Sequence, residues 1–117
     1  MPLGRVIAVV SQKGGAGKTT VAMQLGGGFH TIGASALLID LDPQESAFRW
    51  AESASLIDAK LHLDVRKMSG LELIKHVVDL QGEADYVVLD TPPSIAHPST
   101  MAALAVAHLA IVPAVPS

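Results

Sequence analysis

A glycine-rich segment between a strand-like run and a helix-like run restricts this chain more than any other feature. The run Val6–Val10 is short and rich in β-branched residues, which is typical of a buried strand. A helix is expected from Lys18 to about Thr31. Between them lies the segment Lys13-Gly14-Gly15-Ala16-Gly17-Lys18-Thr19-Thr20. A strand, a glycine-rich turn and a helix in this order form the context in which phosphate-binding loops occur.

The residue types of this loop suit a triphosphate. Glycines let the backbone wrap closely around a phosphate and turn its N–H groups inward, and the helix adds free N–H donors and the positive end of its dipole. Lys18 supplies a cation to the β- and γ-phosphates, and the Thr19 hydroxyl is placed to bind Mg²⁺. The predicted nucleotide-binding residues are Lys13, Gly14, Gly15, Ala16, Gly17, Lys18, Thr19 and Thr20. A dinucleotide-binding turn is disfavoured, because Thr20 stands where its third glycine would be.

Apolar runs and helical stripes alternate along the rest of the chain. Further strands are expected at Ala36–Ile39, Leu61–Val65, Tyr86–Leu89 and Leu109–Val112. Helices are expected from Pro43 to about Ser55, over the stripe from Leu71 to Val78, and from Pro98 to about Ala107. This order predicts an α/β fold of three layers, with a mostly parallel sheet of about five strands and helices on both faces. The length of 117 residues predicts one domain over residues 1–117.

Composition narrows the class of protein. Half of the residues are apolar, which suits strands buried on both faces. The net charge of −3 does not predict a basic nucleic-acid surface, and the pair Arg66-Lys67 is expected to be a solvated turn. The absence of cysteine excludes disulfides and thiolate metal sites. No secretory pattern is present, so a cytoplasmic location is expected. The apolar run Met101–Val112 has about 12 residues, too few for a membrane span of about 20.

Three aspartates stand at the ends of apolar strands. Asp40 and Asp42 follow one strand and Asp90 follows another. Ligands of parallel α/β sheets bind at the carboxyl ends of the strands, and a Mg²⁺-bound triphosphate needs hard oxygen ligands. For each aspartate the alternative is a helix cap or loop residue. The five histidines show no metal-binding spacing and are expected to be surface or core residues.

The run Gly26-Gly27-Gly28 is unexpected inside a helix. Each glycine costs about 0.8–1 kcal/mol relative to alanine in a helix interior. Either the helix packs very closely on the sheet at this run, or it is weak or broken there.

Four segments resemble the sequence boxes of the ParA/MinD ATPases. Gln12–Thr20 resembles the deviant Walker A box KGGxGK[ST], with Gln12 where the common pattern has its first glycine. Leu37–Gln44 resembles the Walker A′ box, and Val87–Ser94 resembles the Walker B segment. Ile111–Ser117 resembles the next strand and loop, although Val115 stands where Gln or Thr is common. The spellings Asp-Leu-Asp-Pro-Gln and Asp-Thr-Pro-Pro-Ser favour the ParA partition branch.

The resemblance implies a role for each matched residue. Lys13 matches the signature lysine, which reaches the partner's phosphates across a nucleotide-sandwich dimer. Lys18 matches the phosphate lysine, and Asp42 matches the residue that positions the attacking water. The implied catalytic residues are therefore Lys13, Lys18 and Asp42. The implied magnesium residues are Thr19, Asp40 and Asp90, the two carboxylates acting largely through metal-bound waters.

The resemblance also implies a function. ParA-like proteins use Mg·ATP to switch between a monomer and a DNA-bound dimer, and so move plasmids, chromosomes or other cargo. A homodimer, a ParB-like centromere-binding partner and non-specific DNA are implied, in the cytoplasm or at the nucleoid. A MinD-like positioning ATPase is the alternative within the family, although no C-terminal amphipathic helix for membrane binding is present. The alternative outside enzymes is a truncated, non-enzymatic nucleotide-binding or protein-interaction fragment.

ParA-type proteins are normally longer than this chain. The early end predicts an incomplete DNA-binding surface and leaves Leu109–Val112 as an uncovered apolar edge. Because such edges pair with other chains, self-association is expected, as a nucleotide sandwich or a strand-exchanged dimer.

Overall fold

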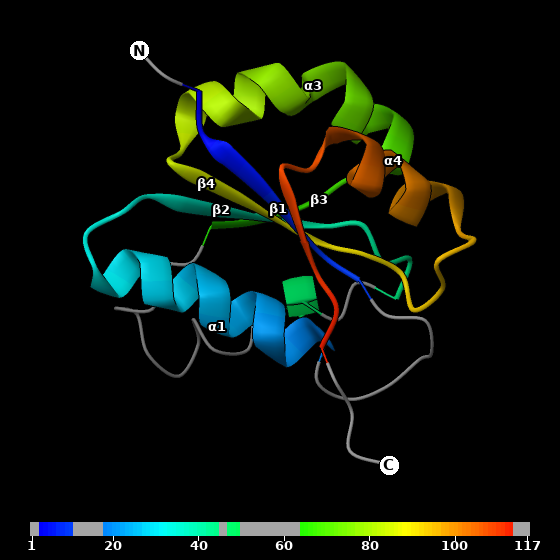
Figure 1. Ribbon diagram of the computed structural model, residues 1–117, viewed down its shortest axis with the longest axis horizontal. Helices are drawn as coiled ribbons and strands as arrows, with labels where there is room; N and C mark the ends of the chain where they lie inside the picture. Colours follow the sequence, from blue (N-terminus) through cyan, green and yellow to red (C-terminus); the bar gives the residue numbers. More distant parts are fainter. Residues whose placement is uncertain (1–2, 11–17, 45–46, 50–63, 114–117) are drawn as a thin grey trace.

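Five parallel strands form the single sheet of the computed structural model (Figure 1). The structure describes residues 3–10, 18–44, 47–49 and 64–113, with the backbone alone at residues 18–20 and 30. In chain order the strands are β1 (Arg5–Val9), β2 (Ala36–Asp40), β3 (Asp64–Lys67), β4 (Tyr86–Asp90) and β5 (Leu109–Ile111). Their spatial order is β3-β2-β4-β1-β5, and every pairing is parallel. The predicted α/β fold is confirmed.

Helices cover both faces of the sheet. Helix α1 (Lys18–Thr31) lies on one face, and α3 (Gly70–Glu83) and α4 (Pro98–Val106) lie on the other (Figure 1). Alternate residues of one strand enter two different cores, because successive side chains point to opposite faces. In β1, Val9 packs in the α1 core, whereas Val6 packs with Leu73 and Leu80 of α3. The apolar runs of β1, β2 and β4 therefore become strands buried on both faces, as expected from their composition.

Side-chain caps begin the two helices of the second face. Ser69 accepts the N–H of Glu72 at 3.1 Å, and Glu72 accepts the N–H of Ser69 at 3.0 Å, which forms a capping box before α3. His97 accepts the N–H of Ser99 through Nδ1 at 3.0 Å, with Pro98 as the first helical residue of α4. Both helices follow strands of the parallel sheet, so their amino ends lie at the carboxyl edge of the sheet.

Helix α1 is continuous through its glycine run. A Cβ atom built at Gly27 or Gly28 would meet no atom of the described residues within 4 Å, so close packing against these residues does not explain the two glycines. Gly26 is buried. The predicted break is not found, and the expected close approach is wrong at Gly27 and Gly28.

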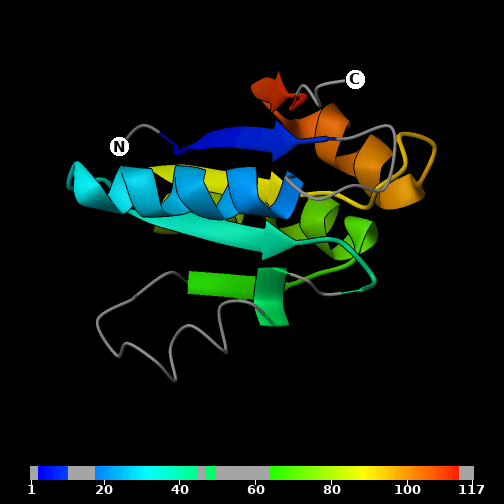
Figure 2. The same cartoon turned by 90° about the horizontal axis from the view of Figure 1, so that it is seen from below.

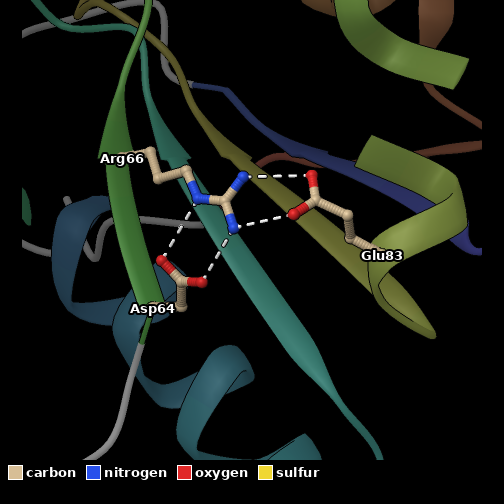
Figure 3. A network of polar contacts seen from close by, with 3 residues as sticks. All are labelled: Asp64, Arg66 and Glu83. Atoms are coloured by element: carbon tan, nitrogen blue, oxygen red, sulfur yellow. Dashed lines mark hydrogen bonds and ion pairs between the residues drawn. The ribbon is translucent and has the colours of Figure 1, made fainter. Parts of the chain in front are cut away.

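The edge strand β3 differs from its prediction. It runs from Asp64 to Lys67 instead of ending at Val65, and residues 61–63 lie outside the described residues. Arg66 and Lys67 are therefore strand residues, not a solvated turn. The guanidinium of Arg66 binds Asp64 at 3.0 Å and binds both carboxylate oxygens of Glu83 at 3.0 Å (Figure 3). This bidentate pairing ties the edge strand to the end of α3, so charged residues are compatible with a strand there.

The prediction of a helix from Pro43 to Ser55 falls mostly outside the described residues. Pro43 and Gln44 form a turn, and residues 47–49 are helical. Trp50 lies outside the described part of the chain. Over the helices that the structure describes, none is both long and apolar enough to cross a membrane.

The opposite edge of the sheet is β5, and it exposes apolar side chains. Leu109 is 55% exposed and Val112 is 61% exposed. At the start of β5, His108 donates its N–H to the carbonyl of Val6 at 2.8 Å and accepts the Val6 N–H on Nδ1 at 2.9 Å. The inner side of β5 is thus joined to β1, and the predicted uncovered edge is found on its outer side.

Candidate functional site

The predicted site residues come together at the carboxyl edge of the sheet. Strand β4 lies between β1 and β2, and Asp90 pairs in register with Val9 on one side and with Asp40 on the other. Helix α1 begins at the side to which the arrows of β1 and β2 point (Figure 2). The predicted loop residues Lys13, Gly14, Gly15, Ala16 and Gly17 lie outside the described residues, as do the side chains of Lys18, Thr19 and Thr20.

Asp40 is the last residue of β2 and is 2% exposed. Its Oδ1 accepts the N–H of Asp42 at 3.0 Å, and its Oδ2 accepts the N–H of Phe48 at 2.9 Å. Burial raises the pKa of Asp40 above its ordinary value; the two N–H bonds oppose this rise, and the charges of Asp90 and Asp42 add to it. Both carboxylate oxygens of Asp40 are thus engaged by the backbone.

Asp42 begins the turn that follows β2. It is 8% exposed, and its Oδ1 accepts the N–H of Gln44 at 3.0 Å. An aspartate that binds the N–H two residues later stabilises a turn. Asp42 also lines the cleft described below.

The segment after β4 is bound to the end of β1. Asp90 is fully buried, and the next residue, Thr91, donates its hydroxyl to the carbonyl of Val9 at 2.8 Å. Further along, Thr100 of α4 donates its hydroxyl to the carbonyl of Ser94 at 2.7 Å. Because Val9 leads into the predicted phosphate loop, Thr91 fixes the Asp90 segment beside that loop. Sequence reasoning gave Thr91 no role of its own.

A cleft of about 460 Å³ opens at this edge on the side of α3 and α4. It is lined by Asp40, Leu41, Asp42, Pro43, Lys67, Met68, Ser69, Glu72, His97 and Ser99. Its volume is in the range of small-molecule sites, which is about 300–1,000 Å³. Sequence reasoning missed Lys67, Glu72 and His97 as lining residues. Their only signal was position, since Lys67 ends a strand and Glu72 and His97 lie at the starts of helices.

The donor chemistry fits Mg²⁺ in part. Asp42 and Asp90 supply hard oxygen atoms at the edge where the predicted phosphate loop begins, and such atoms are the ligands Mg²⁺ prefers. Among the residues that the structure describes, no group of three or more His, Asp or Glu side chains is placed to hold a metal ion. The magnesium role of Thr19 stays a prediction, since its side chain lies outside the described residues.

Sequence comparison finds relatives over almost the whole chain. A profile of the AAA domain matches residues 4–53. The maintenance of carboxysome distribution protein A of Gloeobacter kilaueensis is 34% identical, over 97% of this chain and 50% of that protein. The chromosome-partitioning ATPase Soj of Thermus thermophilus is 35% identical, over 93% of this chain and 54% of that protein. The chain spans about half the length of these curated relatives.

Structure comparison finds the same fold in solved proteins. The crystal structure of cobyrinic acid a,c-diamide synthase from Mycobacterium smegmatis superposes with a TM-score of 0.80 and 24% identity. The match covers 96% of this chain and 60% of that one, which contains bound ADP and magnesium. At this identity the similarity supports the fold alone.

Proposed function

Since the chain belongs to the ParA/Soj/McdA family of P-loop ATPases, we propose that it binds and hydrolyses Mg·ATP as a partition or positioning protein. The observation that carries the proposal is that β2 and β4 end side by side at the carboxyl edge of the sheet, where Asp90 pairs in register with Asp40, two residues before Asp42. A triphosphate held by the preceding loop would place its terminal phosphate at this edge.

Each residue has a distinct task in this proposal. Lys18 and the loop backbone hold the phosphates, and Thr19 and Asp90 hold Mg²⁺. Bound Mg²⁺ neutralises charge that develops on the transferred phosphoryl group. Asp42 accepts a hydrogen bond from the attacking water and orients it toward the phosphate. Lys13 contacts the phosphates of the partner subunit in a dimer that encloses the nucleotide.

The cellular role proposed is movement or positioning of a plasmid, a chromosome or another cargo. A centromere-binding, ParB-like protein and non-specific DNA are the proposed partners. The net charge of −3 gives this chain no overall basic character. DNA binding by this chain alone is therefore expected to be weak.

Titration calorimetry with ATP and Mg²⁺ tests the nucleotide site. We expect binding by the unchanged chain and none by Lys18→Ala, because that substitution removes the cation on the β- and γ-phosphates. Lys75→Ala, an exposed residue of α3, is the matched control and should bind as the unchanged chain does. Equal binding by Lys18→Ala and the unchanged chain would contradict the site.

The half-length coverage of the relatives favours a second candidate, a non-enzymatic fragment that acts through protein contacts. The same titration separates the two. An ATP affinity weaker than about 1 mM, which corresponds to about 4 kcal/mol, together with no phosphate release, would favour the fragment.

A further inference from the structure

We propose that Asp40 is a positioning residue that holds the segment carrying Asp42, and that it is not a magnesium ligand. Its carboxylate binds the backbone at both ends of this segment, at Asp42 and at Phe48. The expected effect on turnover rests on the proposed function. The expected effect of Asp40 on the backbone N–H groups does not rest on the proposed function.

The backbone of Asp40 is itself held on both sides. Its carbonyl accepts the N–H of Met68, which follows β3, at 3.1 Å. On the other side, Asp40 pairs in register with Asp90, and Leu41 donates its N–H to the carbonyl of Asp90 at 2.9 Å. The carboxylate therefore projects from a fixed point of the sheet, and the N–H groups of Asp42 and Phe48 that it binds are held to that point.

The two bonds use both oxygens of one buried carboxylate. Oδ1 binds an N–H two residues later, and Oδ2 binds an N–H eight residues later. With Asp40 only 2% exposed, water cannot readily replace either bond. An asparagine would keep one acceptor and turn an NH₂ group toward the other N–H, so it could satisfy only one of the two donors.

We call the two hydrogen bonds accepted by the Asp40 carboxylate the clamp, and a third bond, accepted by Asp42, extends it. Asp40 fixes the backbone N–H of Asp42, and the carboxylate of Asp42 in turn binds Gln44 at 3.0 Å. At the far end, Ala47 is fully buried in the core with Val9, next to the Phe48 that Asp40 binds. Losing the clamp would release Asp42 from its place in the cleft while the sheet and the core remain.

Asp40→Asn tests the proposal by amide hydrogen exchange and by kinetics. In the unchanged chain, without Mg²⁺ or nucleotide, we expect the amides of Asp42 and Phe48 to exchange slowly, and Mg²⁺ alone to leave their rates unchanged. In Asp40→Asn, at least one of them should exchange about tenfold faster or more. Turnover should fall by about a hundredfold, because a displaced catalytic group loses its geometry. The ATP affinity and the half-saturating Mg²⁺ concentration should stay within about twofold of their original values.

The matched control is Asp85→Asn. Asp85 directly precedes β4, so it lies at the amino-terminal ends of the strands, away from the carboxyl edge that holds Asp40. The Asp85 carboxylate accepts the N–H of Ser35 at 2.9 Å, so this control also perturbs a bond from a carboxylate to the backbone. It should leave turnover and the amides of Asp42 and Phe48 unchanged.

A metal-ligand role for Asp40 would give the opposite pattern. Unchanged exchange at both amides in Asp40→Asn, with an about tenfold higher Mg²⁺ requirement, would overturn the proposal. If the variant does not fold, fast exchange of both amides in the unchanged chain, or slowing of that exchange by Mg²⁺ alone, would overturn it too. If the unchanged chain releases no phosphate from ATP, the proposed function fails, and the exchange rates still test the clamp.

Discussion

Gly70, the first residue of α3, lies directly against Ser99 of α4. A Cβ atom at Gly70 would stand 2.9 Å from the Cα atom of Ser99 and 3.1 Å from the Cβ atom of Ala102. The first of these neighbours is backbone, so it cannot move aside without shifting α4. The contact fixes the spacing of the two helix starts, both of which border the cleft through Ser69 and Ser99.

Gly70→Ala should therefore destabilise the protein. We expect its free energy of unfolding to fall by about 1–3 kcal/mol, because a methyl group is forced into a filled contact. Denaturant titration measures the change. Gly82→Ala in the same helix is the matched control, since its Cβ atom would meet no atom within 4 Å. Equal stability of the two variants would show that the Gly70 contact is not tight.

Gly27→Ala and Gly28→Ala should stabilise the protein. Both residues lie in a continuous helix, and a Cβ atom at either would meet none of the described residues within 4 Å. Each substitution should raise the free energy of unfolding by about 0.5–1 kcal/mol, because alanine loses less conformational freedom than glycine on folding. Thermal melting of the single and double variants measures the gain. A loss of stability in either single variant would contradict the open environment of that glycine.

Asp42→Ala should separate binding from turnover. Removing its carboxylate leaves the phosphate loop intact, so ATP affinity should change by less than about tenfold, whereas phosphate release should fall by about a hundredfold. Calorimetry and a phosphate-release assay measure the two quantities. Asp79→Ala on the exposed side of α3 is the control. Hydrolysis at the original rate in Asp42→Ala would contradict its role.

The pairing of Arg66 with Glu83 predicts a change in acid titration. The hydrogen bonds from Arg66 lower the pKa of Glu83. A lowered carboxyl pKa adds stability above the ordinary pKa of glutamate, and this contribution is lost as the pH falls through the lowered value. In Arg66→Ala the pKa of Glu83 should return upward, and the loss of stability on acidification should be smaller. Titration followed by NMR measures the shift.

Glu72 supplies an internal reference for that titration. Its pKa is also lowered, chiefly by the N–H of Ser69 in the capping box. Arg66→Ala should leave the Glu72 titration unchanged. A parallel upward shift of Glu72 and Glu83 would point to a general loosening of α3 in place of a lost ion pair.

The exposed β5 edge predicts self-association at concentrations of tens of micromolar. Leu109→Lys should weaken a strand-mediated dimer, because a charged side chain disfavours pairing at an edge. Analytical ultracentrifugation with and without ATP measures the fraction of dimer. Leu71→Lys, an equally apolar and exposed position on α3, is the control. A nucleotide-sandwich dimer would instead require ATP and survive Leu109→Lys. A monomer under both conditions would contradict self-association.

Sequence reasoning located the elements whose signals are local. The buried strands carry their own apolar runs, so β1, β2 and β4 fall within one residue of their predicted limits. The edge strand β3 could not be placed in this way, because three of its four residues are charged and Arg66 has its partner Glu83 17 residues later. The lining of the cleft was also beyond reach. The strand order brings together three lining residues, Lys67, Glu72 and His97. Their spacing in the sequence does not predict that they lie at the same cleft.

The strand order also sets when the chain can fold. Val6, the second residue of β1, pairs with Val87, and its neighbour Ile7 pairs with Leu109. During synthesis β1 therefore leaves the ribosome long before either of its neighbours exists. Its apolar side chains must wait unpaired until residues about 80 and about 100 positions later emerge. Parallel sheets of such long-range pairs close slowly, so the nascent chain exposes the apolar side chains of β1 for longer than those of its later strands.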